Sequence, residues 1–163
     1  MVDYVTQTKP NSISDSASDD LSKKIQNLID KEHTDEFSVA NIRKDLQESM
    51  EENAKIFRTK ETLEKQTEIL EELRERYENV TIFDKSKVHN SELVEAIELD
   101  YLLDMSEATV ASALARNESR GAHSRQDFPD RDDTNFMKHS FAFKKDNSAT
   151  VSYTHLRAHE TSE

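Results

Sequence analysis

Apolar residues recur every three or four positions through most of the chain, a pattern typical of helices that bury one face. The first such segment spans residues 18–30 and carries Leu21, Ile25, Leu28 and Ile29. The second spans residues 38–57, with Ser38 as a candidate N-cap. Its predicted buried stripe consists of Val39, Ile42, Leu46, Met50, Asn53 and Phe57.

Two further helices follow, each with a clear apolar stripe. Residues 59–79 place apolar positions at alternating steps of three and four, which favours antiparallel packing against a neighbouring helix. The stripe consists of Leu63, Gln66, Leu70, Leu73, Tyr77 and Val80, and all of these except Gln66 are largely apolar. The fourth helix is predicted to begin after Asn90 and to reach Arg116. Its predicted stripe is Leu93, Ile97, Tyr101, Met105, Ala108 and Ser112, with Val94, Leu102 and Thr109 beside it. Side chains become small after Glu107, so we expect another segment to lie closely over this half.

Helical periodicity ends at the stretch ARNESRGAHSRQDFPDRDD, residues 115–133. This stretch contains Gly121, the only glycine of the chain, and Pro129, one of its two prolines. Glycine can adopt a positive φ after a helix end, and proline prevents the helix from continuing. Residues 137–143 then alternate as a strand does, and residues 150–153 could form the second strand of a hairpin. The predicted fold is mainly α: an antiparallel bundle of three to four helices with an irregular loop and a small C-terminal β-hairpin.

Composition excludes several classes of function. The formal net charge of −12 disfavours nucleic acid as a partner, because phosphates would be repelled. The absence of cysteine excludes thiolate catalysis and cysteine-ligated metal centres within this chain. A single glycine cannot build a phosphate-binding loop or a dinucleotide turn, since both need several positions without a Cβ. No apolar run approaches the ~20 residues that a membrane-spanning helix needs.

The charged stretch allows more than one interpretation. Between Arg116 and Asp133 it holds four arginines, five acids and one histidine. These acids could include a general acid–base pair, but an ion-pair network that holds an irregular loop is the simpler explanation. The local charge nearly cancels within a strongly acidic chain, which favours a loop that docks against another surface. The six histidines show no metal-binding spacing, and the pair His155 and His159 is not expected to bind a metal.

The same stretch closely resembles the C-terminal region of the flavoprotein subunit of succinate dehydrogenase and of fumarate reductase. That family has a run R-x-E-S-R-G-A-H-x-R, then D-F-P-x-R-D-D and an aromatic-x-K-H-T/S. The matching residues here are Arg116, Glu118 to His123, Arg125, Asp127 to Pro129, Arg131 to Asp133, Phe136, Lys138 and His139. Residues 42–58 resemble the family's helix that ends in Phe-Arg, and residues 83–103 resemble a later helical segment. The resemblance covers roughly residues 8–150.

The resemblance implies a domain that supports an FAD-dependent oxidoreductase rather than an active site. The family's FAD-binding domain and its substrate-handling histidine and arginines lie upstream, without counterparts here. We therefore expect no catalytic, cofactor-binding or metal site in this chain, and we expect FAD only in the parent protein. The chain is interpreted as a fragment whose Met1 is an internal methionine. By itself it is expected to be inactive.

The resemblance also implies roles for the residues of the loop and the partners they serve. Arg120, His123 and Arg125 are expected to contact the flavin domain. The accompanying network and interface residues are Arg116, Glu118, Gly121, Asp132, Asp133 and His139. Implied partners are that flavin domain, the iron–sulfur subunit and, indirectly, the membrane anchor subunits. The complete enzyme would interconvert succinate and fumarate and pass electrons to quinone. It would lie at the cytoplasmic face of a bacterial inner membrane, or on the matrix side in mitochondria.

The predicted organisation has four parts: a linker (1–17), a helical bundle domain (18–116), the charged loop with short strands (117–150) and a tail (151–163). The tail resembles translated sequencing-adapter sequence and is predicted to be non-native.

Two alternatives to the succinate dehydrogenase and fumarate reductase family remain open. The chain could belong to an L-aspartate oxidase-type flavoprotein, which carries an ESRG-like run. It could also be a stand-alone acidic helical adaptor that pairs through the seam of residues 63–80.

Overall fold

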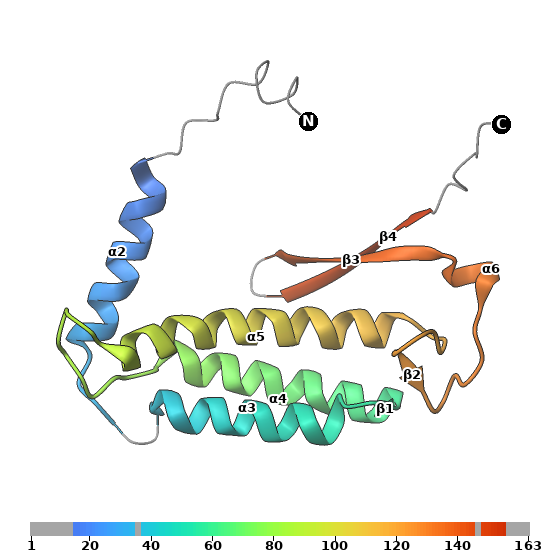
Figure 1. Cartoon of the computed structure of the whole chain (residues 1–163), viewed down its shortest axis with the longest axis horizontal. Coiled ribbons are helices and arrows are strands. Elements are labelled where there is room, and N and C mark those ends of the chain that lie inside the picture. The colour runs from blue at the N-terminus through green and yellow to red at the C-terminus, as the bar shows by residue number, and fades with distance from the viewer. Residues whose placement is uncertain (1–14, 35–36, 146–147, 156–163) are drawn as a thin grey trace, which may run out of the picture.

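The computed structural model describes residues 15–34, 37–145 and 148–155 and shows an elongated helical bundle (Figure 1). Helices α3 (Val39–Asn53), α4 (Lys60–Glu78) and α5 (Ser91–Ala115) run alternately up and down. Helix α2 (Asp15–Asp30) projects from the end of the bundle at which α4 stops. Strands β3 (Lys138–Lys145) and β4 (Ser148–His155) form an antiparallel hairpin over α5. The predicted fold class is therefore confirmed.

Capping side chains define where the three bundle helices begin. The Ser38 hydroxyl accepts a hydrogen bond from the Asn41 amide, 3.4 Å away, and the Asn90 side chain accepts one from the Leu93 amide at 2.8 Å. Thr59 forms a reciprocal capping box with Thr62 at the start of α4. These contacts satisfy amide groups that the first helical turn leaves without a partner. The predicted starts of the three helices are confirmed.

The end of α3 differs from the prediction. The helix stops at Asn53, and the Phe57 side chain, expected in its buried stripe, is 66% exposed. The two residues Phe57–Arg58 instead form strand β1, which pairs in parallel with β2, Ser124–Arg125. Pairing with a segment distant in the sequence therefore ends the helix, although the local periodicity would have allowed it to continue.

The core lies between α3, α4 and α5. Its buried side chains include Ile42, Leu63, Leu70, Leu73, Leu99, Leu103 and Val110. A pair of buried amides is accommodated within it, because Asn53 donates to the Gln66 side chain at 3.0 Å and Gln66 donates to the Ser49 hydroxyl at 3.1 Å. Buried amides paired in this way avoid the cost of an unsatisfied polar group.

Helix α5 buries a face that only partly overlaps the predicted one, since Leu93 and Ile97 do pack against the core. Its buried residues are Ala96, Leu99, Leu103, Val110 and Ala113. Tyr101 and Met105, expected in the core, are 60% and 66% exposed. Apolar residues occupy most of the circumference of α5, so two different stripes satisfy helical spacing. Contact with α3 and α4 selects the stripe that contains the leucines.

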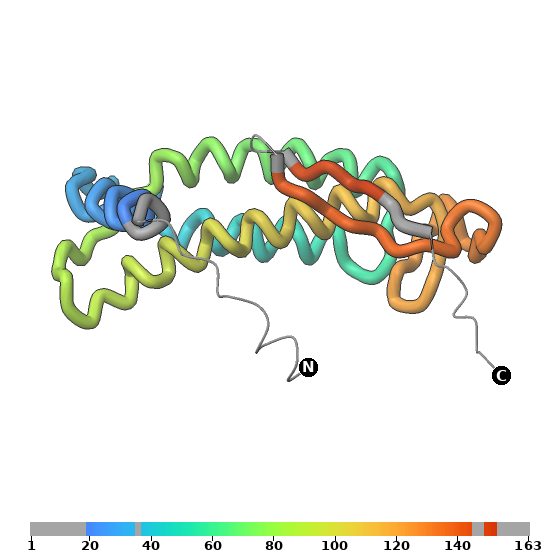
Figure 2. Tube along the Cα trace, turned by 90° about the horizontal axis from the view of Figure 1, so that it is seen from above, coloured from blue at the N-terminus to red at the C-terminus, as the bar shows by residue number. Residues whose placement is uncertain are grey.

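The hairpin covers the small-residue half of α5, as predicted (Figures 1 and 2). Its register places Phe141 opposite Ser152 and Ala142 opposite Val151. Ala142 lines a pocket together with Ala108 and Ser112 of α5, so this strand face is turned toward the helix. Phe141 and Phe143 belong to the opposite face and remain largely exposed.

Helix α2 and strand β4 extend into the segments that were predicted to be a linker and a tail. Helix α2 starts at Asp15, inside the segment predicted to be a linker, and residues 1–14 lie outside the described residues. Strand β4 runs to His155, inside the segment predicted to be non-native, and residues 156–163, including His159, lie outside the described residues. None of the helices in the described ranges has the length and apolar character needed to cross a membrane.

Candidate functional site

A tight turn organises the charged loop that follows α5. Arg120 and His123 exchange two backbone hydrogen bonds, of 2.8 and 3.0 Å, across Gly121 and Ala122. Gly121 has a φ of +59°, in the left-handed region that favours glycine. A Cβ built on Gly121 would meet no atom within 4 Å, so backbone conformation rather than crowding explains the glycine.

Glu118 is the centre of the loop and is fully buried, with 0% exposure. Its two carboxylate oxygens accept hydrogen bonds from Arg120 at 2.8 and 2.9 Å and from the Asp132 amide at 2.9 Å, and Arg116 donates to it as well. Burial alone would raise the pKa of Glu118. The bonds from Arg120, Asp132 and Arg116 outweigh that effect and hold its pKa at about 2. Glu118 is therefore ionised at neutral pH and anchors the loop.

Arg116 connects this anchor to the hairpin. Besides Glu118, its guanidinium donates to the carbonyls of Phe136 and Lys138, at 3.1 and 2.6 Å, and to the Ser140 hydroxyl at 3.0 Å. It also lies over the Phe136 ring, 5.5 Å from the centroid. The end of α5 and the start of β3 are consequently held together by one side chain.

Arg125 and Asp127 connect two helix ends. Arg125 is 1% exposed and binds Asp127 through two parallel bonds of 2.8 and 2.7 Å. Its remaining nitrogen donates to the Ala113 carbonyl at 2.9 Å, at the C-terminus of α5, which has no basic residue in its own last turn. Asp127 accepts a bond of 3.0 Å from the Lys60 amide at the N-terminus of α4. A cation thus lies at a helix C-terminus and an anion at a helix N-terminus, which is the stabilising arrangement for both dipoles.

His123 lies between the loop and β1. Its Nε2 is 3.1 Å from the Arg116 carbonyl, and its Nδ1 is 3.2 Å from Nη1 of Arg58. Because a guanidinium only donates, Nδ1 must accept and Nε2 must carry the proton, so the ring is neutral. Burial lowers the pKa of His123, and the positive charges of Arg58, Arg125 and Arg116 lower it further.

The remaining predicted residues lie at the outer side of the loop. Asp132 caps the short helix α6 (Asp133–Phe136) through the Asn135 amide at 3.0 Å. Asp133 accepts bonds from Arg120 at 2.7 Å and from Arg131 at 2.6 Å. The hydrogen bonds that Arg120 donates to Glu118 and Asp133 raise the pKa of Arg120.

His139 is exposed on β3 and makes none of the network's ion pairs. It lines a pocket of about 340 Å³ together with Arg116, Arg120 and His123. The structure therefore gathers the predicted residues at one end of the bundle.

This arrangement is that of a self-contained ion-pair network. Hydrogen bonds from Arg125 hold the pKa of Asp127 at about 2, close to that of Glu118, so both carboxylates are ionised at neutral pH. A group with such a low pKa is a poor general acid or base near neutral pH. Within the described ranges, no group of three or more histidine, aspartate or glutamate side chains could hold a metal ion.

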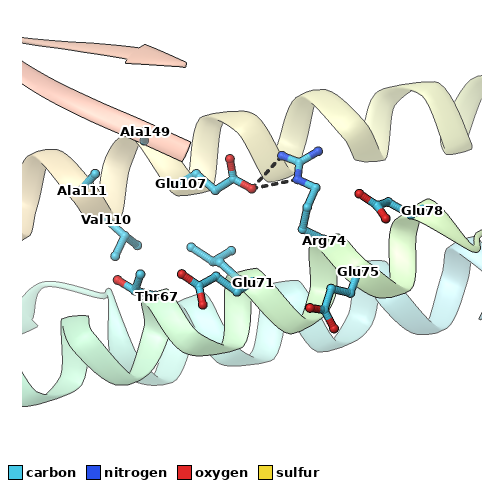
Figure 3. A pocket seen from close by; sticks show the side chains of 10 residues that line it. Thr67, Glu71, Arg74, Glu75, Glu78, Glu107, Val110, Ala111 and Ala149 are labelled. Atoms are coloured by element: carbon cyan, nitrogen blue, oxygen red, sulfur yellow. Dashed lines mark hydrogen bonds and ion pairs between the residues drawn. The ribbon is translucent and has the colours of Figure 1, made fainter. Parts of the chain in front are cut away.

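A second, partly buried ion cluster had no counterpart in the sequence analysis. Arg74 of α4 binds Asp100, Asp104 and Glu107 of α5 at 2.6, 2.6 and 2.8 Å. Figure 3 shows Arg74 directed toward Glu107 beside a pocket of about 310 Å³ between the two helices. The three acids are spaced by four and three positions, which places them on one face of a helix. That spacing was the available signal, although nothing local indicates that Arg74 faces them.

Lysines tie this cluster to the outer elements. Lys24 of α2 pairs with Asp100, and Lys144 of β3 pairs with Asp104. Burial raises the pKa of the neighbouring Tyr77, whose hydroxyl donates to the Ala96 carbonyl at 3.0 Å. The cluster therefore contributes to positioning α2 and the hairpin on the α4–α5 pair.

Comparison with known proteins gives consistent matches. The family model described as fumarate reductase flavoprotein C-term matches residues 43–162. The succinate dehydrogenase flavoprotein subunit of Rickettsia bellii is 43% identical over 136 residues, covering 82% of this chain and 23% of the relative. The fumarate reductase flavoprotein subunit of Escherichia coli is 42% identical over 121 residues, covering 72% of this chain and 20% of the relative.

Solved structures agree with these matches. A structure of quinol-fumarate reductase with menaquinol molecules superposes with a TM-score of 0.84 at 34% identity, covering 96% of this chain and 27% of that one. Adenylylsulfate reductase from Archaeoglobus fulgidus, at 24% identity and a TM-score of 0.75, shares the fold. The chain spans about a quarter of the length of the curated relatives and solved structures that it matches.

Proposed function

Because the chain belongs to the fumarate reductase flavoprotein C-terminal family, we propose that it supports the FAD-dependent interconversion of succinate and fumarate by a flavoprotein subunit. In this role the chain supplies no reacting group. It buttresses the FAD-binding domain and contributes to the surface that meets the iron–sulfur subunit. FAD is bound by the other part of the subunit, and electrons pass from it toward quinone.

The observation that best supports this role is the exposed apolar side of α5. Val94, Tyr101, Leu102 and Met105 are 53%, 60%, 43% and 66% exposed. A soluble helix normally turns polar residues toward water, and several large apolar side chains exposed on one side of a helix are typical of a surface that another protein part covers. A flavin domain packed on this side of α5 would remove these side chains from water.

The charged loop is proposed to fix the geometry of that contact. Arg120 and His123 are half-buried and line the pocket at the end of the bundle, so they are placed to touch an adjoining domain. Arg125 was expected to make such a contact itself. Since its guanidinium is buried and bonded to Asp127 and Ala113, we propose that it acts by positioning the ends of α4 and α5.

The proposed partners and location follow from the proteins to which the chain is similar. The solved relatives include a Mycobacterium smegmatis Sdh1 complex and quinol-fumarate reductase with menaquinol. We propose an iron–sulfur subunit as the direct partner and membrane anchor subunits as indirect ones. The assembly would be peripheral to the cytoplasmic face of a bacterial inner membrane, or to the matrix side in mitochondria.

A chimera tests this proposal. The chain would replace the matching C-terminal segment of the E. coli fumarate reductase flavoprotein subunit, to which it is 42% identical. We expect the chimera to retain bound flavin, to co-purify with the iron–sulfur subunit and to reduce fumarate. The isolated chain should remain colourless with FAD and should not act on succinate. A chimera that assembles no better than the subunit lacking this segment would contradict the proposal, as would flavin binding by the isolated chain.

A further inference from the structure

We propose that Arg58 and the small-residue pocket beside it form a binding site for a carboxylate group. The site consists only of residues of this chain, and it does not depend on the flavoprotein role. Arg58 belongs to β1, and the pocket lies where β1, the second half of α5 and β3 meet.

Arg58 is exceptional among the arginines in the described ranges because it has no carboxylate partner. The others all form ion pairs: Arg43 with Glu98, Arg74 with three acids, Arg76 with Asp45, Arg116 and Arg120 with Glu118, Arg125 with Asp127, and Arg131 with Asp133. In a chain with 34 acidic residues, an unpaired and half-buried guanidinium is unexpected. Burying a charge without a partner is unfavourable, so such a group favours an anion.

The local contacts hold the Arg58 guanidinium in one orientation. Nε donates to the carbonyls of Ala54 and Lys55 at 3.2 and 2.6 Å, just beyond α3. Nη1 donates to Nδ1 of His123 at 3.2 Å. Within the described residues, no hydrogen bond or ion pair involves Nη2. A guanidinium that is already oriented loses less conformational freedom when it binds an anion.

The pocket beside Arg58 can admit such a group. It has a volume of about 460 Å³ and its lining includes Ala108, Ser112, Ala113 and Ala142. These side chains are short, so an incoming chain can approach closely and a methylene next to its carboxylate can rest on alanine.

The single unmatched charge and the planar donors of Arg58 favour a carboxylate over a phosphate. Arg116 also lines the pocket, but its donors already bind Glu118, two carbonyls and Ser140. One unmatched guanidinium complements a monoanion, and its planar donors match a carboxylate. Burial lowers the pKa of Arg58 and no acid opposes that effect, which agrees with an uncompensated charge. The carboxylate could come from a free aliphatic acid or from an aspartate or glutamate of a polypeptide that covers this face.

Thermal unfolding in acetate tests the site. The chain would be melted in sodium acetate up to 200 mM and in sodium chloride at equal ionic strength. We expect acetate to raise the Tm of the unsubstituted chain by about 3 °C relative to chloride, with saturation. Arg58→Gln should abolish this difference. Arg131→Gln removes a comparable charge from an exposed arginine and should leave the difference intact.

A second variant keeps the test decisive if Arg58→Gln does not fold. Ala142→Leu fills the pocket from exposed strand β3 and leaves Arg58 in place, so it should also abolish the acetate effect. The proposal is overturned if acetate and chloride give equal Tm values, or if the acetate effect persists in either pocket variant.

The same measurement on the chimera distinguishes the two sources of the carboxylate. If a side chain of the flavin-binding part already fills the site, acetate will not stabilise the chimera, and Arg58→Gln will lower the Tm of the chimera more than that of the isolated chain. If the natural ligand is a free acid, the acetate effect will persist in the chimera. A chimera that fails to assemble bears on the flavoprotein role, while the result on the isolated chain still decides whether the site exists.

Discussion

At the scale of single residues, the loop depends on charges that are buried but fully compensated. Glu118 is removed from water, and three donor groups replace the hydration that it loses. A buried ion pair of this kind adds little net stability compared with an apolar pair, but the loss of one partner leaves the other charge uncompensated. Substitution of Glu118 should therefore reveal how strongly the loop depends on it.

Glu118→Gln should lower the free energy of unfolding by about 3 kcal/mol, because Arg116 and Arg120 would lose their shared anion. Urea unfolding of the chain, followed by circular dichroism, measures this change. Glu64→Gln is the matched control, since Glu64 is exposed and forms an ion pair with Lys60, and it should cost less than about 0.5 kcal/mol. Equal losses for the two variants would show that burial of Glu118 is not important.

Stability should also fall at acid pH through the same carboxylate. The pKa of Glu118 is about 2 in the folded chain, below its ordinary value of 4.5, so the unfolded chain binds the proton more readily. The contribution is complete above pH 4.5 and is lost as the pH falls toward 2. Urea midpoints measured between pH 6 and pH 2.5 should decline less steeply for Glu118→Gln than for the unsubstituted chain. Parallel declines would contradict the assignment.

At the scale of elements, the sequence predicts helices where the information is local. Ser38, Thr59 and Asn90 mark helix starts because capping involves residues within three positions of each other. The end of α3 and the buried face of α5 depend on long-range partners. Phe57 is held by β2, and Leu99 and Leu103 are selected by the helices they touch, so periodicity alone could not predict either outcome.

The ends of α4 and α5 should depend on a single buried arginine. Arg125→Gln removes the charge at the C-terminus of α5 and leaves Asp127 unmatched, and it should cost about 3 kcal/mol. Hydrogen exchange should show faster exchange in the last turn of α5 than in its middle. The control Arg131→Gln should change stability by less than about 0.5 kcal/mol, since Arg131 is exposed. Uniform acceleration across α5 would indicate global destabilisation instead of loss of the cap.

At the scale of the whole molecule, the candidate site could be located from the sequence, but its internal arrangement could not. The resemblance selected a loop whose residues do gather at one end of the bundle. It gave no means of telling that Arg125 is buried while Arg120 and His123 reach the pocket. The Arg74 cluster was missed because it is formed across two helices, and only their packing brings its charges together.

The exposed side of α5 should matter for assembly and little for folding. The double substitution Tyr101→Ser with Met105→Gln replaces two side chains that already face water, so the stability of the isolated chain should change by less than about 0.5 kcal/mol per site. Binding of a hydrophobic dye to the isolated chain should fall.

In the chimera, the double substitution should weaken association of the two parts and reduce bound flavin, because the covered apolar area would be lost. Val88→Ser is the matched control, since Val88 is 70% exposed but lies outside α5, and it should leave flavin content unchanged. If the double variant retains full flavin content, this side of α5 is not where the flavin-binding part rests.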